Sequence, residues 1–147
     1  GDKITLTVLM LGGGPEIRGK TLPVFHQHSY DVVIKEMISW GTESSMLLGC
    51  QPCILAYGIG RTHLEAASLC LEAMAKGDLS KQSKTEKLIK DEINKEGIGP
   101  LGMGGSCTVL GVFVNIGPQR ASGVRIISLR AGCCFDPRRA TVTFCFN

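Results

Sequence analysis

Two cysteines separated by Gln51 and Pro52 are the most distinctive chemical feature of the chain. A Cys-x-x-Cys pair, here Cys50 and Cys53, can carry out thiol–disulfide exchange or give two thiolates to a metal. The redox chemistry needs a helix N-terminus, which lowers the pKa of the first thiol. Instead, Cys53 begins a continuous apolar run to Ile59 that is typical of a buried strand. Thiol-redox function through Cys50 and Cys53 is therefore poorly supported, and it stays an alternative.

A zinc site is a second possibility for the same cysteines. Such a site needs about four ligands, and the chain offers four thiols in two groups, namely Cys50, Cys53, Cys133 and Cys134. Adjacent cysteines project awkwardly for one tetrahedron, and no second Cys-x-x-Cys is present. A purely structural role suits Cys53 at the start of the apolar run. It suits Cys50 less well, because Cys50 lies in the loop ahead of the strand, where ligands tend to bind.

Two further segments contain residue types that bind anions. Five glycines fall within residues 97–105, and their main-chain N–H groups could face an anion. No Lys-Ser or Lys-Thr follows in P-loop register, and a strand-like run comes next, so nucleotide binding is poorly supported. Arg138 and Arg139 could hold a carboxylate bidentately or lie on a solvated rim. His26 and His28 are only a weak indication of a metal, because no carboxylate or cysteine is near them in the sequence.

The elements that must position these residues follow from periodicity and from end signals. Alternating apolar residues indicate strands, and capping residues such as those of the Thr62–Glu65 and Ser83–Glu86 boxes begin helices. We predict an ordered loop over residues 15–28 and the end of the first helix at Gly41. The predicted strands are residues 4–10, 53–59, 108–115, 124–129 and 141–146, and the predicted helices are residues 29–40, 62–77 and 83–97.

This order predicts an α/β fold, with a mixed sheet of about five strands and about three helices in a single domain over residues 1–147. The composition is that of an ordinary globular protein, with 44% hydrophobic and 20% charged residues. A dispersed net charge of +3 argues against a nucleic-acid partner. No apolar run is long enough to span a membrane and no signal peptide is visible, so we expect a cytoplasmic protein.

Several stretches of the chain, in the same order, resemble motifs of the iron–sulfur hydro-lyases, which are the class I fumarases and L-tartrate dehydratases. The most specific is residues 92–105, EINKEGIGPLGMGG, which is similar to that family's EINKLGIGPxGLGG. The others are residues 12–16 (GGGPE beside GGGSEN), 50–62 (CQP followed by GIGRT beside CPP and GxGGT), 108–112 (TVLGV beside TTVLGV) and 134–140 (CFDPRRA beside CWxxRRA). Together they resemble the C-terminal half of the family's α region.

The resemblance implies a 4Fe–4S cluster held by three cysteines, whose open iron acts as a Lewis acid on a hydroxy-dicarboxylic acid of the fumarate/malate or tartrate type. Cys50 falls on one of the family's cluster cysteines. The resemblance also implies that the remaining ligands come from outside this chain. The residues implied for the diacid site are Gly60, Thr62, Gly104, Gly105, Arg138 and Arg139.

The same resemblance implies partners. These are the preceding half of the α region, the β subunit of the same enzyme, or both, so we expect an oligomer that binds a small dicarboxylate. An alternative is a binding or assembly module of the same fold that carries no cluster. The sequence does not choose between fumarate, tartrate and another hydroxy-diacid.

Overall fold

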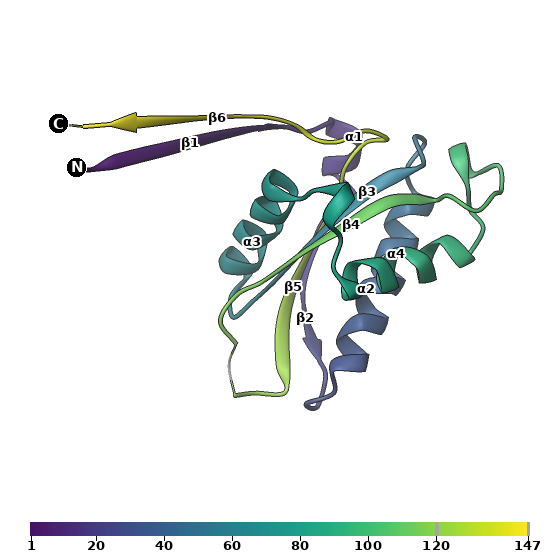
Figure 1. The fold of residues 1–147 in the computed structure, drawn as a ribbon. Coiled ribbons are helices and arrows are strands. Elements are labelled where there is room, and N and C mark those ends of the chain that lie inside the picture. Colours follow the sequence, from purple (N-terminus) through teal and green to yellow (C-terminus); the bar gives the residue numbers. More distant parts are fainter. Residues whose placement is uncertain (120, 147) are drawn as a thin grey trace.

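A four-stranded mixed sheet forms the centre of the molecule in the computed structural model, which describes residues 1–119 and 121–146. The strand order is β2-β5-β3-β4, in which β3 and β4 are parallel and the other neighbours are antiparallel. Helix α3 covers one face, and helices α2 and α4 cover the other (Figure 1). The strands are β2 (Lys20–Phe25), β3 (Cys53–Gly60), β4 (Val109–Ile116) and β5 (Val124–Ala131), and the helices are α2 (Tyr30–Met46), α3 (His63–Lys76) and α4 (Lys84–Lys95).

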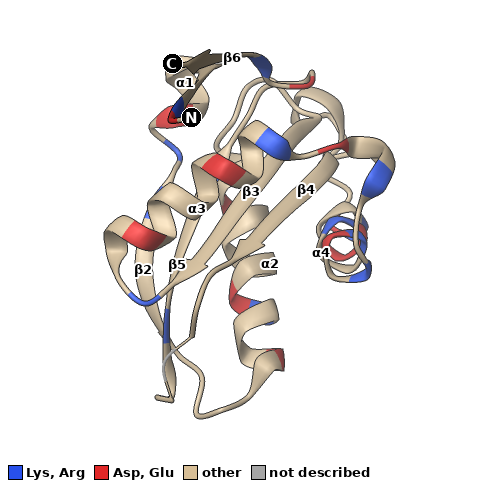
Figure 2. Ribbon diagram, turned by 60° about the vertical axis from the view of Figure 1, so that its left-hand side comes forward, with Lys and Arg blue, Asp and Glu red and all other residues tan. Residues whose placement is uncertain are grey.

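Strand β3 is buried along its whole length, which explains its continuous apolar sequence. Because successive side chains of a strand point to opposite faces, Leu55 and Tyr57 pack toward α2 and α4, whereas Ile54 and Ala56 pack toward α3. Charged residues occur along α3 and α4, whereas β3 and β4 contain none (Figure 2). The predicted α/β fold with a mixed sheet is confirmed.

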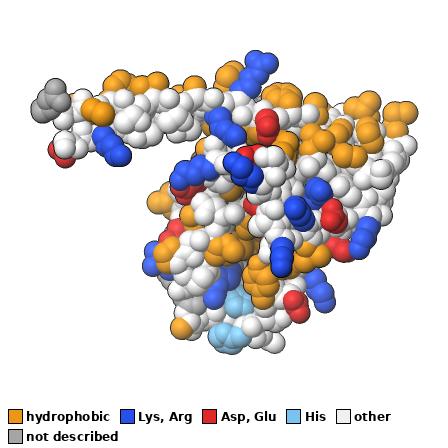
Figure 3. All heavy atoms as spheres, viewed as in Figure 1, with side chains coloured by type: hydrophobic (Ala, Val, Ile, Leu, Met, Phe, Trp, Pro, Cys, Tyr) orange, Lys and Arg blue, Asp and Glu red, His pale blue; other side chains and the backbone are white. Residues whose placement is uncertain are grey.

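A second, two-stranded sheet projects from this body as an antiparallel ribbon (Figure 1). It pairs β1 (Lys3–Met10) with β6 (Arg138–Cys145), so the first and last strands of the chain lie side by side. One face of the ribbon is apolar and exposed, since Ile4 pairs with Phe144 and Leu6 with Val142. Orange side chains gather along it in Figure 3. Short elements complete the chain: α1 (Gly13–Glu16) and the 3-10 turns η1 (Leu79–Lys81) and η2 (Pro100–Gly102).

Two sequence predictions about the elements are wrong. Residues 15–28 are not one loop, because they contain the end of α1 and the edge strand β2. Pro23 argues against a strand, because proline cannot donate a ladder hydrogen bond. An edge strand tolerates it, since one side of that strand needs no such bond. Helix α2 also continues past Gly41 to Met46. A Cβ at Gly41 would lie 2.4 Å from Tyr57 Oη, so this glycine permits a close contact between helix and sheet.

The predicted helix starts are largely confirmed. Ser83 and Glu86 form a complete capping box at the start of α4. Thr62 accepts the N–H of Glu65 at 3.1 Å, but the Glu65 carboxylate accepts the main-chain N–H of Arg61 and not that of the cap residue. Among the described residues, no helix is both long and apolar enough to cross a lipid bilayer.

Candidate functional site

Three thiols gather at the amino end of β3. Cys50 lies two residues before Pro52 and is partly exposed. Strand β5 is antiparallel to β3 and ends here, where Gly132 N donates to Ile54 O at 2.6 Å. Cys133 and Cys134 follow directly. Burial raises the pKa of the Cys50 thiol, and the neighbouring thiolates of Cys133 and Cys134 raise it further. The Cys50 thiol therefore lies close enough to Cys133 and to Cys134 for a charge on either to act on it.

The glycine segment after β1 reaches the same end of the sheet. A Cβ at Gly12 would lie 3.1 Å from Cys133 Sγ, so the missing side chain lets the main chain approach this thiol. The short helix α1 that follows is fixed by an ion pair between Glu16 and Arg130 of β5. Residues 12–16, which resemble a family motif, are in this way held beside Cys133.

The glycine-rich loop, residues 97–105, is tied to the residue next to Cys50. Leu101 N donates to Gln51 O at 3.3 Å. Main-chain φ is positive at Gly97, Gly99, Gly102, Gly104 and Gly105, a region that residues with a Cβ avoid. Thr108 Oγ1 accepts the N–H of Gly99 at 3.1 Å, which ties the loop to the residue just before β4. Gly104 and Gly105 thus belong to a constrained loop at the Cys50 end of the sheet.

Asn94, at the end of α4, anchors this loop to the sheet through three hydrogen bonds. Its Oδ1 accepts the N–H groups of Thr108 and Val109, both at 2.8 Å, and its Nδ2 donates to Val109 O at 3.1 Å. We expect Asn94→Ala to lower the free energy of unfolding by about 2–3 kcal/mol, because three main-chain groups lose their partner. Urea denaturation measures this. Asn115→Ala, which removes a single bond to Glu72, is the control, and an equal loss in the two variants would contradict this role of Asn94.

The two arginines that follow the cysteines have different surroundings. Arg139 donates to Met74 O at 3.1 Å and to Gly77 O at 2.8 Å, so its guanidinium satisfies carbonyls at the C-terminal end of α3. Arg138 is exposed and begins β6 four residues after Cys134. Of the two, Arg138 is the one whose guanidinium does not bind the C-terminal carbonyls of α3, and it is close to Cys134 in the sequence.

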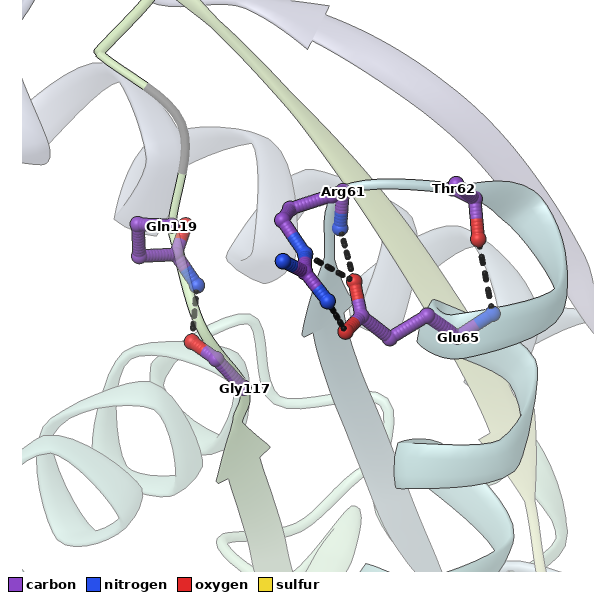
Figure 4. A network of polar contacts seen from close by, with 5 residues as sticks. All are labelled: Arg61, Thr62, Glu65, Gly117 and Gln119. Carbon is purple, nitrogen blue, oxygen red and sulfur yellow. Dashed lines mark hydrogen bonds and ion pairs between the residues drawn. The ribbon is translucent and has the colours of Figure 1, made fainter.

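Gly60 and Thr62 lie at the other end of β3. Gly60 is seven steps along the strand from Cys53, which corresponds to about 23 Å of extended chain. A Cβ at Gly60 would lie 2.8 Å from Ala66 N, and Thr62 caps α3. Figure 4 shows Thr62 bonded to Glu65 N while Arg61 and the Glu65 carboxylate pair with each other. One small diacid cannot contact both ends of the strand, so the structure does not bring Gly60 and Thr62 together with Cys50.

Cys53, the second cysteine of the Cys-x-x-Cys, has the properties of a core residue. It is fully buried, and its Sγ lies 3.4 Å from Ser45 Oγ. Burial raises the pKa of the Cys53 thiol to about 11. Neither thiol of the pair has the lowered pKa that a dithiol oxidant needs, so the surroundings of both cysteines oppose the redox alternative.

The thiols should therefore differ strongly in their reactivity. At pH 8 a thiol with a pKa near 11 is ionised in roughly one molecule in a thousand, so we expect iodoacetamide to leave Cys53 unmodified while it labels the exposed Cys134 and Cys145. Mass spectrometry of digested protein measures this, with labelling in urea as the control in which all seven cysteines react. Modification of native Cys53 as fast as Cys134 would contradict the buried, protonated thiol.

The zinc alternative also lacks support. Within residues 1–119 and 121–146, no three His, Cys, Asp or Glu side chains are arranged to hold a metal ion. Cys50, Cys133 and Cys134 are neighbours, but they do not form a complete ligand set. From the sequence, Cys133 and Cys134 are grouped with Cys50 only as candidate zinc ligands, and neither is assigned to an iron–sulfur cluster. The signal was present, since Cys134 is the first residue of the stretch that resembles CWxxRRA.

Comparison with known proteins gives consistent matches. Residues 1–143 match the sequence profile of the fumarate hydratase (Fumerase) family. The chain is 26% identical over 147 residues to the L(+)-tartrate dehydratase subunit alpha of Escherichia coli, covering 97% of this chain and 48% of that protein. The Shigella sonnei subunit is 25% identical over 146 residues, covering 96% and 47%. A putative L(+)-tartrate dehydratase subunit alpha of Methanocaldococcus jannaschii is 33% identical over 92 residues, covering 59% and 30%. The chain spans about half the length of the first two relatives.

Proposed function

Because the chain belongs to the fumarate hydratase (Fumerase) family, we propose that it is part of an iron–sulfur hydro-lyase that adds or removes water on a hydroxy-dicarboxylic acid. The chain would form a single domain that corresponds to the C-terminal half of the family's α region. The match over residues 1–143 and the coverage of about half of the tartrate dehydratase α subunits support this assignment.

The grouping of Cys50 with Cys133 and Cys134 is the observation that carries the proposal. Thiolates are the usual ligands of iron–sulfur clusters. A bound cation would relieve the electrostatic repulsion between an ionised Cys50 and the thiolates of Cys133 and Cys134. The donor set of this chain fits a 4Fe–4S cluster only in part. Among the described residues, no three possible ligands are arranged around one metal position, so the chain does not supply a full ligand set. We assign Cys50 as one ligand and Cys134 as a second, since Cys134 is exposed. Further ligands come from outside this chain.

When bound, such a cluster supplies a Lewis acid for the hydroxyl and carboxylate of the substrate. The residues of this chain would bind and orient the diacid beside it. Gly105 of the glycine-rich loop and the guanidinium of Arg138 are exposed and suit its carboxylates, whereas the N–H of Gly104 already donates to Ile98 O at 2.8 Å. We do not assign Gly60, Thr62 or Arg139 to the diacid, because helix packing and capping account for them.

The ribbon supports the proposal that another polypeptide segment completes the enzyme. A two-stranded ribbon is at best marginally stable alone, and the apolar face built from Ile4, Leu6, Val142 and Phe144 is exposed. Eight residue pairs give a face of roughly 26 by 10 Å. About 260 Å² is well below the roughly 800 Å² that each partner buries in a stable complex. We therefore propose that the half of the α subunit that this chain does not span covers this apolar face of the ribbon. We expect a β subunit as a further partner.

A reducing compartment such as the cytoplasm fits this proposal. All seven cysteines are free thiols, and thiols persist where disulfides do not form. The experiment that tests the function is co-expression with the preceding α-region segment and the β subunit, followed by an anaerobic assay. Formation of fumarate from malate, or loss of L-tartrate, would support it. Absence of water addition or elimination on any hydroxy-diacid would favour a binding module without catalysis.

A further inference from the structure

A small cavity lies at the carboxyl ends of the parallel strands β3 and β4. Its volume is about 250 Å³, and Ile59, Ile116 and Val33 form its apolar side. His26, His28 and Arg125 contribute polar groups. The end of β3 that it occupies is about 20 Å from Cys53 by strand length. In open α/β sheets, ligands bind beyond the carboxyl ends of the strands, so the position itself is one where a ligand is expected.

His26 is the polar side chain most in need of a partner. Its side chain lines the cavity and the residue is 5% exposed, yet neither Nδ1 nor Nε2 has a hydrogen-bond partner among the described residues. Its main-chain groups are occupied, since His26 N donates to Gly123 O at 2.8 Å and His26 O accepts Ser29 N at 2.7 Å. These two hydrogen bonds hold the main chain of His26, from which the imidazole projects, in a fixed position. A buried donor and acceptor left without partners is unfavourable, so a molecule in the cavity would satisfy what the chain does not.

Arg125 gives the cavity a positive charge. Its Nη1 donates to Ser122 O at 2.9 Å and to Val124 O at 3.0 Å, which holds the guanidinium in the wall. Burial lowers the pKa of His26, and the charges of Arg125 and His28 lower it further. A neutral His26 offers one N–H donor and one acceptor. Among the residues that the structure describes, no acidic residue lines the cavity, so its charge favours an anion.

The first turn of α2 adds further donors. Tyr30 and Val33, in this turn, line the cavity. The helix has 17 residues, and no side chain among those described caps its N-terminus. Uncapped N–H groups and the helix dipole favour a negative charge near this end. Gln27 and His28, just before the helix, have positive φ values of 45° and 65°, a conformation that residues with a Cβ rarely adopt.

We propose that this cavity binds a small organic carboxylate, whose oxygens pair with Arg125 and His26 and whose carbon chain packs on Val33, Ile59 and Ile116. The apolar side distinguishes an organic carboxylate from an inorganic anion, which would leave these side chains without a partner. Nothing in the proposed hydro-lyase chemistry requires this site, so the two proposals stand or fail separately.

Titration of the iron-free chain with sodium butyrate, at constant ionic strength, tests the proposal. The imidazole nitrogens of only three histidines need to be followed by NMR, and calorimetry gives the dissociation constant. We expect saturable shifts of His26. We also expect binding at least about tenfold weaker in His26→Phe, which keeps a buried ring without nitrogens, and in Arg125→Met, which keeps length without charge. His63→Gln is the matched control, because His63 begins α3 outside the cavity.

The outcomes separate the possibilities. Binding that is weakened in both cavity variants, unchanged in His63→Gln and stronger for butyrate than for inorganic phosphate supports the proposal. Thermal melting of each variant shows that it is folded. Absence of a saturable shift, equal affinity in His26→Phe and the parent chain, or preference for phosphate would each overturn it.

Discussion

Replacing Cys50 by serine is expected to abolish cluster assembly when this chain is reconstituted with the rest of the enzyme. Cys50 is the partly exposed thiol at the amino end of β3, beside Cys133 and Cys134. A serine hydroxyl is a far poorer iron ligand than a thiolate. We expect at least a tenfold loss of bound iron and sulfide, because loss of even an outer-shell partner of a metal ligand typically costs about 10–100-fold in metal affinity. Anaerobic reconstitution followed by iron analysis measures it.

Two controls accompany this variant. Cys145→Ser changes an exposed thiol at the end of the ribbon and should leave the iron content unchanged. Cys53→Ala tests the Cys-x-x-Cys directly, and it should retain iron because the Cys53 side chain is buried in the core. Iron that survives in Cys50→Ser but is lost in Cys53→Ala would show that the wrong cysteine has been assigned. Cys134→Ser and Cys133→Ser, compared side by side, identify the second ligand.

Gly58→Ala is expected to cause one of the largest losses of stability among single methyl additions to this chain. A Cβ at Gly58 would lie 2.1 Å from Ala66 O and 2.3 Å from Cys70 N. Both are main-chain atoms of α3, so no side-chain rotation relieves the clash, and the helix must move off the sheet. We expect the free energy of unfolding to fall by at least about 3 kcal/mol, or folding to fail. Urea denaturation followed by circular dichroism measures this.

Gly49→Ala is the matched control, because a Cβ at Gly49 meets no atom within 4 Å. It should change the free energy of unfolding by less than about 0.5 kcal/mol. If Gly58→Ala proved as mild as Gly49→Ala, the packing of α3 directly on β3 would be incorrect.

Much of the central sheet could be predicted because its signals are local. The apolar run of β3 and the capping box at Ser83 need only neighbouring residues to be recognised. Strand β2 could not, since Pro23 is acceptable only at a sheet edge, and edge position is a property of the whole topology. The continuation of α2 past Gly41 likewise depends on Tyr57, a residue of another element.

In the candidate site, too, some features follow from local sequence signals and others depend on the whole fold. Cys50 could be identified from its place before a buried strand and from its resemblance to a family motif. Its proximity to Cys133 and Cys134 depends on the antiparallel pairing of β3 with β5, which brings residue 131 beside residue 55. The distance of Gly60 and Thr62 from Cys50 follows from the length of β3, because nearness in sequence becomes separation along an extended strand.

We propose that this chain holds part of an iron–sulfur cluster and needs another segment to complete it. The most direct test is anaerobic reconstitution with iron and sulfide, with the chain alone and with the preceding α-region segment, read as iron content and visible absorbance. We expect a cluster only when that segment is present. A full cluster on the chain alone, or no cluster in either sample, would contradict it.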